Sequence, residues 1–274
     1  MKALFSAFFL SGLLASAGRP LAGQDFFRMH LGDAIHDHFG ASARGLGDLD
    51  GDGLGDYAVG ATQGGLNDGG YVRVFSGADG SVLLTLEGAA PGDRFGTSLG
   101  PLGDLDGDGI PDFLVGAPGA DSRGIDAGSV LIFSGRDGLL LRTVIGDYQN
   151  DEFGSSVCAA GDLDGDGLPD FIAGAIQPEF RQFGYARVVS GGTGQPIFTF
   201  LGEGKNDEFG STVLGGLDLD GDPAGDLLVA APREGARAGG VWAFSGADGL
   251  LLAHIRGSLD SQLGSELAVP GDAD

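Results

Sequence analysis

A unit of about 56 residues recurs along most of this chain and restricts its fold more than any other feature of the sequence. Each unit opens with Phe-Gly. An Asp-rich run, a short apolar segment, an alternating segment with a Gly-rich turn and a last apolar segment follow. The pair begins at positions 39, 95, 153 and 209, and a Leu-Gly copy begins at 263. Such units bury their apolar faces by stacking on one another, so the sequence predicts a repeat architecture.

Each unit is predicted to hold four short β-strands and no helix. The apolar segments are short and are bounded by Gly, Asp and Pro, as is typical of strands. Turns such as Ser76–Gly80 join the last two strands as a hairpin, with glycine where the backbone needs a positive φ. Glycine supplies 55 of the 274 residues without a Gly-X-Y period, which excludes collagen.

Repeated four-stranded antiparallel sheets predict an all-β fold, specifically a β-propeller. We expect four complete blades over residues 39–262 and the start of a truncated fifth unit over 263–274. A β-sandwich is the alternative, but it would not explain the regular period. We expect Trp242 to pack between blades. The Phe of each pair should lie in the core; these residues are Phe39, Phe95, Phe153 and Phe209.

The Asp-rich runs are nine-residue loops with carboxylates at positions one, three, five and nine. Glycines at positions four and six allow a tight turn, so the carboxylates converge. Ca²⁺ takes six to eight oxygen ligands from carboxylates, carbonyls and water. We therefore predict about four structural calcium ions, each held by these carboxylates and the carbonyl of position seven. The expected ligands are Asp48, Asp50, Asp52, Leu54, Asp56, Asp104, Asp106, Asp108, Ile110, Asp112, Asp162, Asp164, Asp166, Leu168, Asp170, Asp218, Asp220, Asp222, Ala224 and Asp226.

Other interpretations of these loops are less consistent with the sequence. An EF-hand needs Glu at position twelve and flanking helices, whereas position twelve here is Val or Ala inside a predicted strand. A dockerin-like module would also place a helix after the loop. A plain polar turn would leave four like charges close together. Magnesium prefers fewer protein ligands and more water. In the fourth loop Pro223 replaces glycine and is expected to weaken that site.

Phe-Gly, the Asp loop and Gly-Ala-Pro together resemble the FG-GAP repeat, found in the propeller of integrin α subunits. The resemblance covers residues 39–274, and Gly-Ala-Pro is intact only at 116–118. It implies a seven-bladed ring with ligands bound on one face. Residues 26–31 resemble a lone strand, and residues 271–274 begin another Asp loop. We expect a chain truncated from a larger protein; a four-bladed ring with two attached strands is the alternative.

Alternating strands place the calcium loops and the hairpin turns on one face, and the remaining loops on the other. The opposite face is expected to bind a protein or glycan ligand, because variable loops on a rigid scaffold often carry binding. Its predicted loops are residues 62–68, 119–126, 176–183 and 233–239. Its basic candidates are Arg123, Arg181, Arg233 and Arg237, with solvated arginines as the alternative.

Lys2, an apolar run and Ala15-Ser16-Ala17 predict a signal peptide over residues 1–17, followed by a lead-in over 18–38. The run is too short to span a bilayer, and no later stretch is suitable. We therefore expect a secreted or extracellular protein, or a periplasmic or cell-surface one if bacterial. Cys158 is expected to be a buried free thiol.

The formal net charge of -24 excludes nucleic acid as a partner, since phosphates would be repelled. The four His residues show no catalytic or metal spacing, although a cluster at 36–38 is a weaker transition-metal candidate. Asp pairs committed to calcium are poor general acids. We therefore predict a non-catalytic adhesion or recognition scaffold with calcium as cofactor. The alternative is an accessory part of a larger extracellular enzyme, such as a carbohydrate-active hydrolase.

Overall fold

Sixteen β-strands and one four-residue helix make up the secondary structure of the described residues. The computed structural model describes residues 29–176 and 183–268. The predicted signal peptide, Arg181 and residues 269–274 lie outside these ranges. No helix in the described part of the chain is long and apolar enough to cross a membrane.

The strands form four antiparallel sheets of four, each in sequence order. Blade 1 contains β1 (Phe39–Gly47), β2 (Asp56–Ala61), β3 (Tyr71–Phe75) and β4 (Val82–Glu87). Blade 2 contains β5 (Ser98–Gly103), β6 (Asp112–Ala117), β7 (Ser129–Phe133) and β8 (Leu140–Ile145). Blade 3 contains β9 (Phe153–Gly161), β10 (Asp170–Ala175), β11 (Phe183–Val189) and β12 (Pro196–Lys205). Blade 4 contains β13 (Val213–Leu217), β14 (Asp226–Ala231), β15 (Gly240–Phe244) and β16 (Leu251–Arg256), with helix α1 (Glu234–Arg237) before β15.

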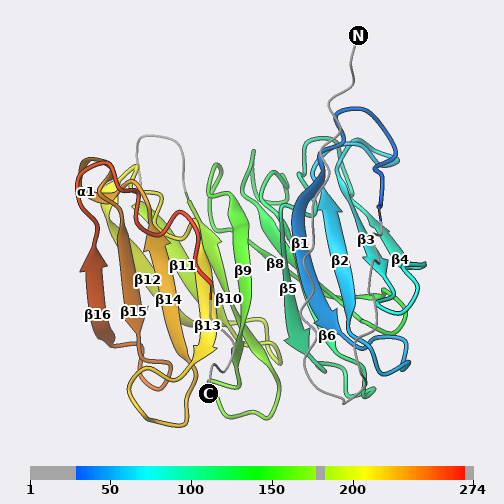
Figure 1. Ribbon diagram of the computed structural model, residues 1–274. Helices are drawn as coiled ribbons and strands as arrows, with labels where there is room; N and C mark the ends of the chain where they lie inside the picture. The colour runs from blue at the N-terminus through cyan, green and yellow to red at the C-terminus, as the bar shows by residue number, and fades with distance from the viewer. Residues whose placement is uncertain (1–28, 177–182, 269–274) are drawn as a thin grey trace, which may run out of the picture.

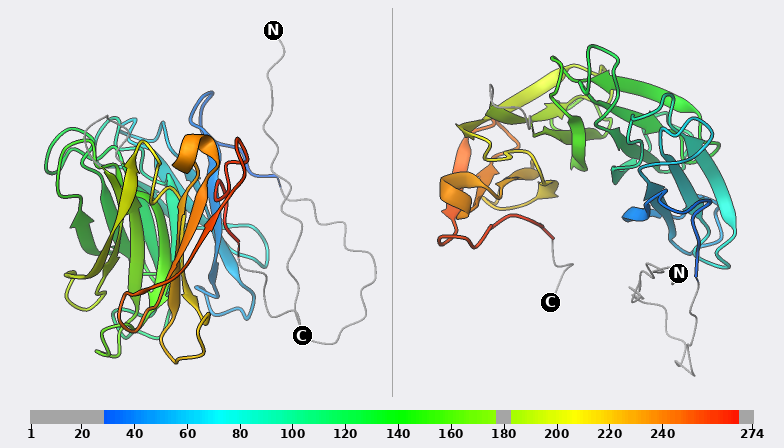
Figure 2. Two further views of the ribbon diagram at one scale, coloured as in Figure 1. Left: turned by 90° about the vertical axis from the view of Figure 1, so that its left-hand side faces the viewer. Right: turned by 90° about the horizontal axis from the view of Figure 1, so that it is seen from above.

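This arrangement confirms the predicted all-β fold of four-stranded antiparallel blades. The blades stand side by side (Figure 1), with β1, β5, β9 and β13 on the inner side of a curve. Viewed from above, the four blades of the β-propeller follow an open arc (Figure 2). Blades 1 and 4 lie at its two ends, so the described residues do not form a closed four-bladed ring.

The glycines of the repeat are explained by the contact between neighbouring blades. A methyl group on Gly116 of β6 would lie 2.0 Å from the carbonyl oxygen of Gly154 in the next blade. The same carbonyl accepts a hydrogen bond of 2.8 Å from the Ser98 hydroxyl of β5. The other two junctions repeat this contact, with Gly60 and Ser42 against Gly96, and with Gly174 and Ser156 against Gly210. Glycine is required because the backbone of the next blade occupies the space of a side chain.

The core lies largely between the blades. Phe95, Phe153 and Phe209 are buried as predicted, whereas Phe39, at the end of the arc, is only partly buried. Trp242 is buried and its ring stacks on Phe244 of the same strand, which in turn stacks on Phe200 of the preceding blade. Trp242 therefore belongs to the core cluster that blades 3 and 4 share, in agreement with its predicted place between blades.

Cys158 in β9 is half-buried and makes no disulfide. Burial raises the pKa of its thiol, which lowers its reactivity.

The strand predicted over residues 26–31 is not present at the described residues 29–31. This segment packs by its side chains instead. The ring of His30 lies 4.0 Å from that of Phe75, and Asp33 pairs with Arg73 at 2.5 Å. At the other end, Leu263 makes an isolated bridge to Gly239, and residues 263–268 form no strand.

Substituting Gly116→Ala should lower the melting temperature, because the new methyl group would overlap the backbone carbonyl of Gly154 in the next blade. We expect a loss of about 2 kcal/mol, or roughly 5 °C for a domain of this size. Thermal melting followed by circular dichroism measures it. The matched control is Gly45→Ala in β1, where the nearest atom to the new methyl group would be 3.9 Å away. Equal melting temperatures for the two variants would contradict this explanation.

Candidate metal centre

The aspartate at position nine of each loop ties the loop to the neighbouring hairpin. Asp112 begins β6 and is fully buried. Its Oδ2 accepts the Leu105 N–H at 2.7 Å, and its Oδ1 accepts the Gly135 N–H at 3.1 Å. Asp56, Asp170 and Asp226 accept the equivalent pairs of N–H groups. The Asp loops and the hairpin turns therefore share one end of each blade, at the bottom of Figure 1.

The aspartate at position one shapes the loop from within. In the second loop, Asp104 Oδ1 accepts the Gly107 N–H at 2.8 Å, and its Oδ2 accepts the Gly109 N–H at 2.9 Å. Loops one and three contain the same two bonds. In loop four, Pro223 has no N–H to donate at position six, so only the Gly221 bond remains. The fourth loop is thus held by fewer internal bonds.

These turns bring carboxylates close together, as the loop spacing predicts. In loops one, three and four, positions one, three and nine each offer an oxygen within 4.8 Å of the others, and in loop two positions one, three and five do so. The four groups are Asp48, Asp50 and Asp56; Asp104, Asp106 and Asp108; Asp162, Asp164 and Asp170; and Asp218, Asp220 and Asp226. Such all-oxygen groups suit a hard divalent cation. Ligation by the full predicted set, including the carbonyls of position seven, stays a prediction.

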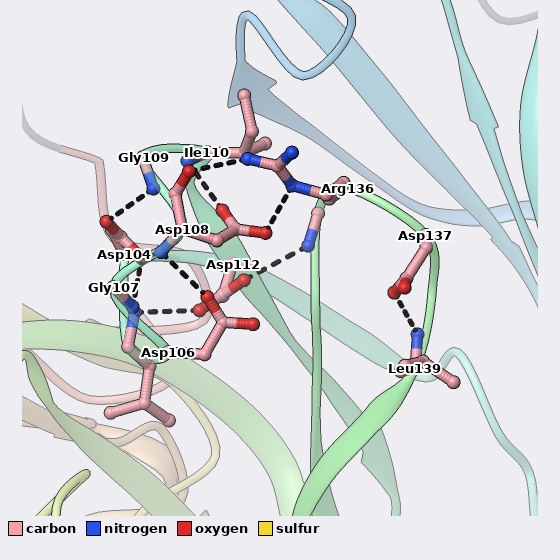
Figure 3. Close-up of polar contacts among 12 residues, drawn as sticks. Asp104, Asp106, Gly107, Asp108, Gly109, Ile110, Asp112, Arg136, Asp137 and Leu139 are labelled. Carbon is pink, nitrogen blue, oxygen red and sulfur yellow. Dashed lines mark hydrogen bonds and ion pairs between the residues drawn. The ribbon is translucent and has the colours of Figure 1, made fainter.

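Burial and charge act differently on the carboxylates of one loop. Burial raises the pKa of Asp112, although its two main-chain hydrogen bonds oppose the rise. Burial raises the pKa of Asp170 in the same way. Asp108 is instead bonded by the guanidinium of Arg136, which lowers its pKa (Figure 3). Arg136 comes from the turn between β7 and β8.

Two of the basic residues predicted on the opposite face, Arg123 and Arg233, form ion pairs with acidic residues of the same chain. Arg123 lies 3.7 Å from Asp147, and Arg233 lies 2.9 Å from Glu208. Arg237 is exposed at the end of α1. Arg123, Asp147 and the buried Arg187 also line a cavity of about 350 Å³ between blades 2 and 3.

Among the described residues, His36, Asp37 and His38 do not form a group of side chains close enough to share a metal ion. Asp37 is buried and accepts hydrogen bonds from the Tyr71 hydroxyl at 2.7 Å and from the Phe39 N–H at 3.0 Å. Burial raises its pKa, but these bonds outweigh burial and hold the pKa below its usual value. Asp37 therefore holds the turn that precedes β1 against β3 of blade 1.

This aspartate is one of four that the motif analysis missed. Asp93 and Asp151 also close the turn that leads into a Phe-Gly pair by accepting main-chain N–H groups. The signal was present, since an aspartate precedes each pair by two residues, at positions 37, 93, 151 and 207.

Substituting Asp112→Ala should destabilise the metal-free chain, because one buried and one partly buried N–H group would lose their acceptor. We expect a loss of about 2–4 kcal/mol. Denaturant unfolding in the presence of a chelator measures it. Asp106→Ala removes an exposed carboxylate from the same loop and should change the metal-free stability by less than about 0.5 kcal/mol. Comparable losses in both variants would show that position nine has no separate structural role.

Comparison with known proteins agrees with the repeat. A model of the FG-GAP repeat matches residues 95–133 and 153–177. The chain is 32% identical to integrin alpha-5 of Xenopus laevis over 212 residues, which cover 71% of this chain and 20% of that protein. It is 36% identical to human integrin alpha-IIb over 167 residues, which cover 54% of this chain and 16% of that protein. It spans about a fifth of the length of these relatives.

Among solved structures, a rhamnogalacturonan lyase is similar with a TM-score of 0.41 and 16% identity, covering 77% of this chain and 50% of that one. This likeness is too weak to support any statement about activity. The repeat, the blades and the sequence relatives agree with one another: the chain is an FG-GAP repeat protein with a β-propeller like that of integrin alpha subunits.

Proposed function

We propose that this chain is a secreted recognition scaffold without catalytic activity, whose blades are stabilised by about four calcium ions. One observation supports it above all: the same loop occurs four times, each time with three carboxylate oxygens within 4.8 Å of one another. Like charges at this spacing repel, and a divalent cation removes the repulsion.

Calcium suits these loops better than magnesium. Each loop offers four carboxylates and a main-chain carbonyl, close to the number of protein ligands that Ca²⁺ accepts, whereas Mg²⁺ usually retains several waters. Four Ca²⁺ ions would also offset part of the net charge of -24. Bound there, calcium would link the loop between the first two strands to the rigid hairpin through the aspartate at position nine.

The recognition role is supported by the integrin alpha relatives and by the separation of the two ends of the blades. The Asp loops lie at one end, and the longer, variable loops lie at the other (Figure 1). We place a protein or glycan ligand on this second end, where Arg123 and Arg233 are more than half exposed. Extracellular localisation rests on the apolar N-terminal run, which lies outside the described residues.

The alternative, an accessory propeller of an extracellular hydrolase, shares this scaffold. No specific feature favours it, because the carboxylate clusters of the described residues all lie in the Asp loops. Binding of the calcium-loaded chain to immobilised glycans and matrix proteins tests recognition directly. Arg123→Glu should weaken binding through this end, and unchanged binding would place the ligand elsewhere.

Titration of Ca²⁺ into the metal-stripped full chain should show about four equivalents and a large rise in melting temperature, because ions that bind only the folded state stabilise it. Isothermal titration calorimetry and thermal melting measure the two effects. Mg²⁺ at the same concentration is the control and should raise the melting temperature less. Absence of Ca²⁺ binding by a folded chain would contradict the proposal.

A further inference from the structure

One of the four Asp loops already holds a positive charge from the protein itself. Arg136 Nε donates to Asp108 Oδ2 at 2.5 Å, and Arg136 Nη2 donates to the Asp108 main-chain oxygen, also at 2.5 Å. The other oxygen of this carboxylate accepts the Ile110 N–H at 2.8 Å. Both oxygens of the position-five ligand are therefore engaged. Figure 3 shows the guanidinium reaching Asp108 from the β7–β8 turn.

The other three loops have no charge at the equivalent turn position. The turns read Ser-Gly-Ala in blades 1 and 4, Ser-Gly-Arg in blade 2 and Ser-Gly-Gly in blade 3, so Ala78, Gly192 and Ala247 replace Arg136. The position faces the loop in blade 3 as well, since a methyl group on Gly192 would lie 2.2 Å from Asp166 Oδ2. The turn thus places a side chain next to the position-five carboxylate, and only blade 2 puts a cation there.

The second loop also has a different arrangement of carboxylates. Its close group is Asp104, Asp106 and Asp108, whereas the other loops bring together positions one, three and nine. The group that includes position five is therefore the one with the arginine bound to it. A guanidinium at this carboxylate offsets one negative charge of the loop, occupies a ligand oxygen and repels an incoming divalent cation.

We propose that Arg136 acts as a tethered cation that lowers the calcium affinity of loop two and makes that loop less dependent on the metal than the other three. This inference rests on the proposed calcium function of the loops. It makes the four repeats unequal: blade 2 keeps its loop ordered when calcium is scarce, while the other loops respond to the ion.

The test is calcium titration of the metal-stripped full chain and of two variants in opposite directions. Arg136→Ala should raise the affinity of one equivalent about two- to fivefold, the size expected for removing one exposed charge contact. It should also lower the melting temperature of the metal-free chain. Ala78→Arg places the arginine beside Asp52 in loop one, which shares the Asp-Leu-Asp-Gly-Asp-Gly sequence, and should weaken one equivalent by a similar factor. Pro223 is expected to change the calcium affinity of loop four independently of Arg136. The test therefore compares each variant's calcium affinities with those of the wild type.

Lys205→Gln is the matched control, since it removes one exposed positive charge at the opposite end of a blade. It should leave the four calcium affinities unchanged. Identical isotherms for the wild type and Arg136→Ala, with calcium bound in both, would overturn the proposed role of Arg136 but leave the proposed calcium function standing. Absence of calcium binding in the folded wild type and both variants would overturn the proposed function and this inference with it.

Discussion

The contact on which the rest of the structure depends is the approach of each Phe-Gly carbonyl to a glycine of the preceding blade. At the three junctions this oxygen lies where a side chain would begin on Gly60, Gly116 or Gly174, and a serine hydroxyl bonds it. The phenylalanine beside the same glycine enters the core. The Phe-Gly dipeptide therefore fixes both the spacing and the packing of neighbouring blades. This explains why Phe-Gly and the glycine that opens Gly-Ala-Pro, which lie far apart in sequence, recur together.

A second constraint links this junction to the Asp loops. The aspartate at position nine begins the second strand of each blade and accepts N–H groups from its loop and from the adjacent hairpin turn. The loop is therefore anchored at its buried end by hydrogen bonds that do not involve an ion. The carboxylates at positions one, three and five are exposed or half-buried and follow this anchored base, so the site combines a rigid end with a polar end that a cation can order.

The sequence was sufficient to predict the strands, their order and the core, because short apolar runs between glycines recur with one period. It did not reveal the pairing of Arg136 with Asp108, because they lie 28 residues apart and meet only once the blade has folded. The strand predicted from the apolar residues of the lead-in is not formed at the described residues 29–31. In the described part of this segment, the side chains of His30 and Asp33 supply the contacts to blade 1.

The exception at blade 4 follows from the same close approach. Ala230 stands where the other blades have glycine, and Leu263-Gly264 lies against it in place of Phe-Gly. A methyl group on Gly264 would lie 2.9 Å from the Cβ of Ala230, so the glycine on the incoming side must remain without a side chain. At the three internal junctions both partners are glycine, whereas here a single glycine accommodates the contact. The repeat thus tolerates a change in one half of its motif as long as the other half retains its space.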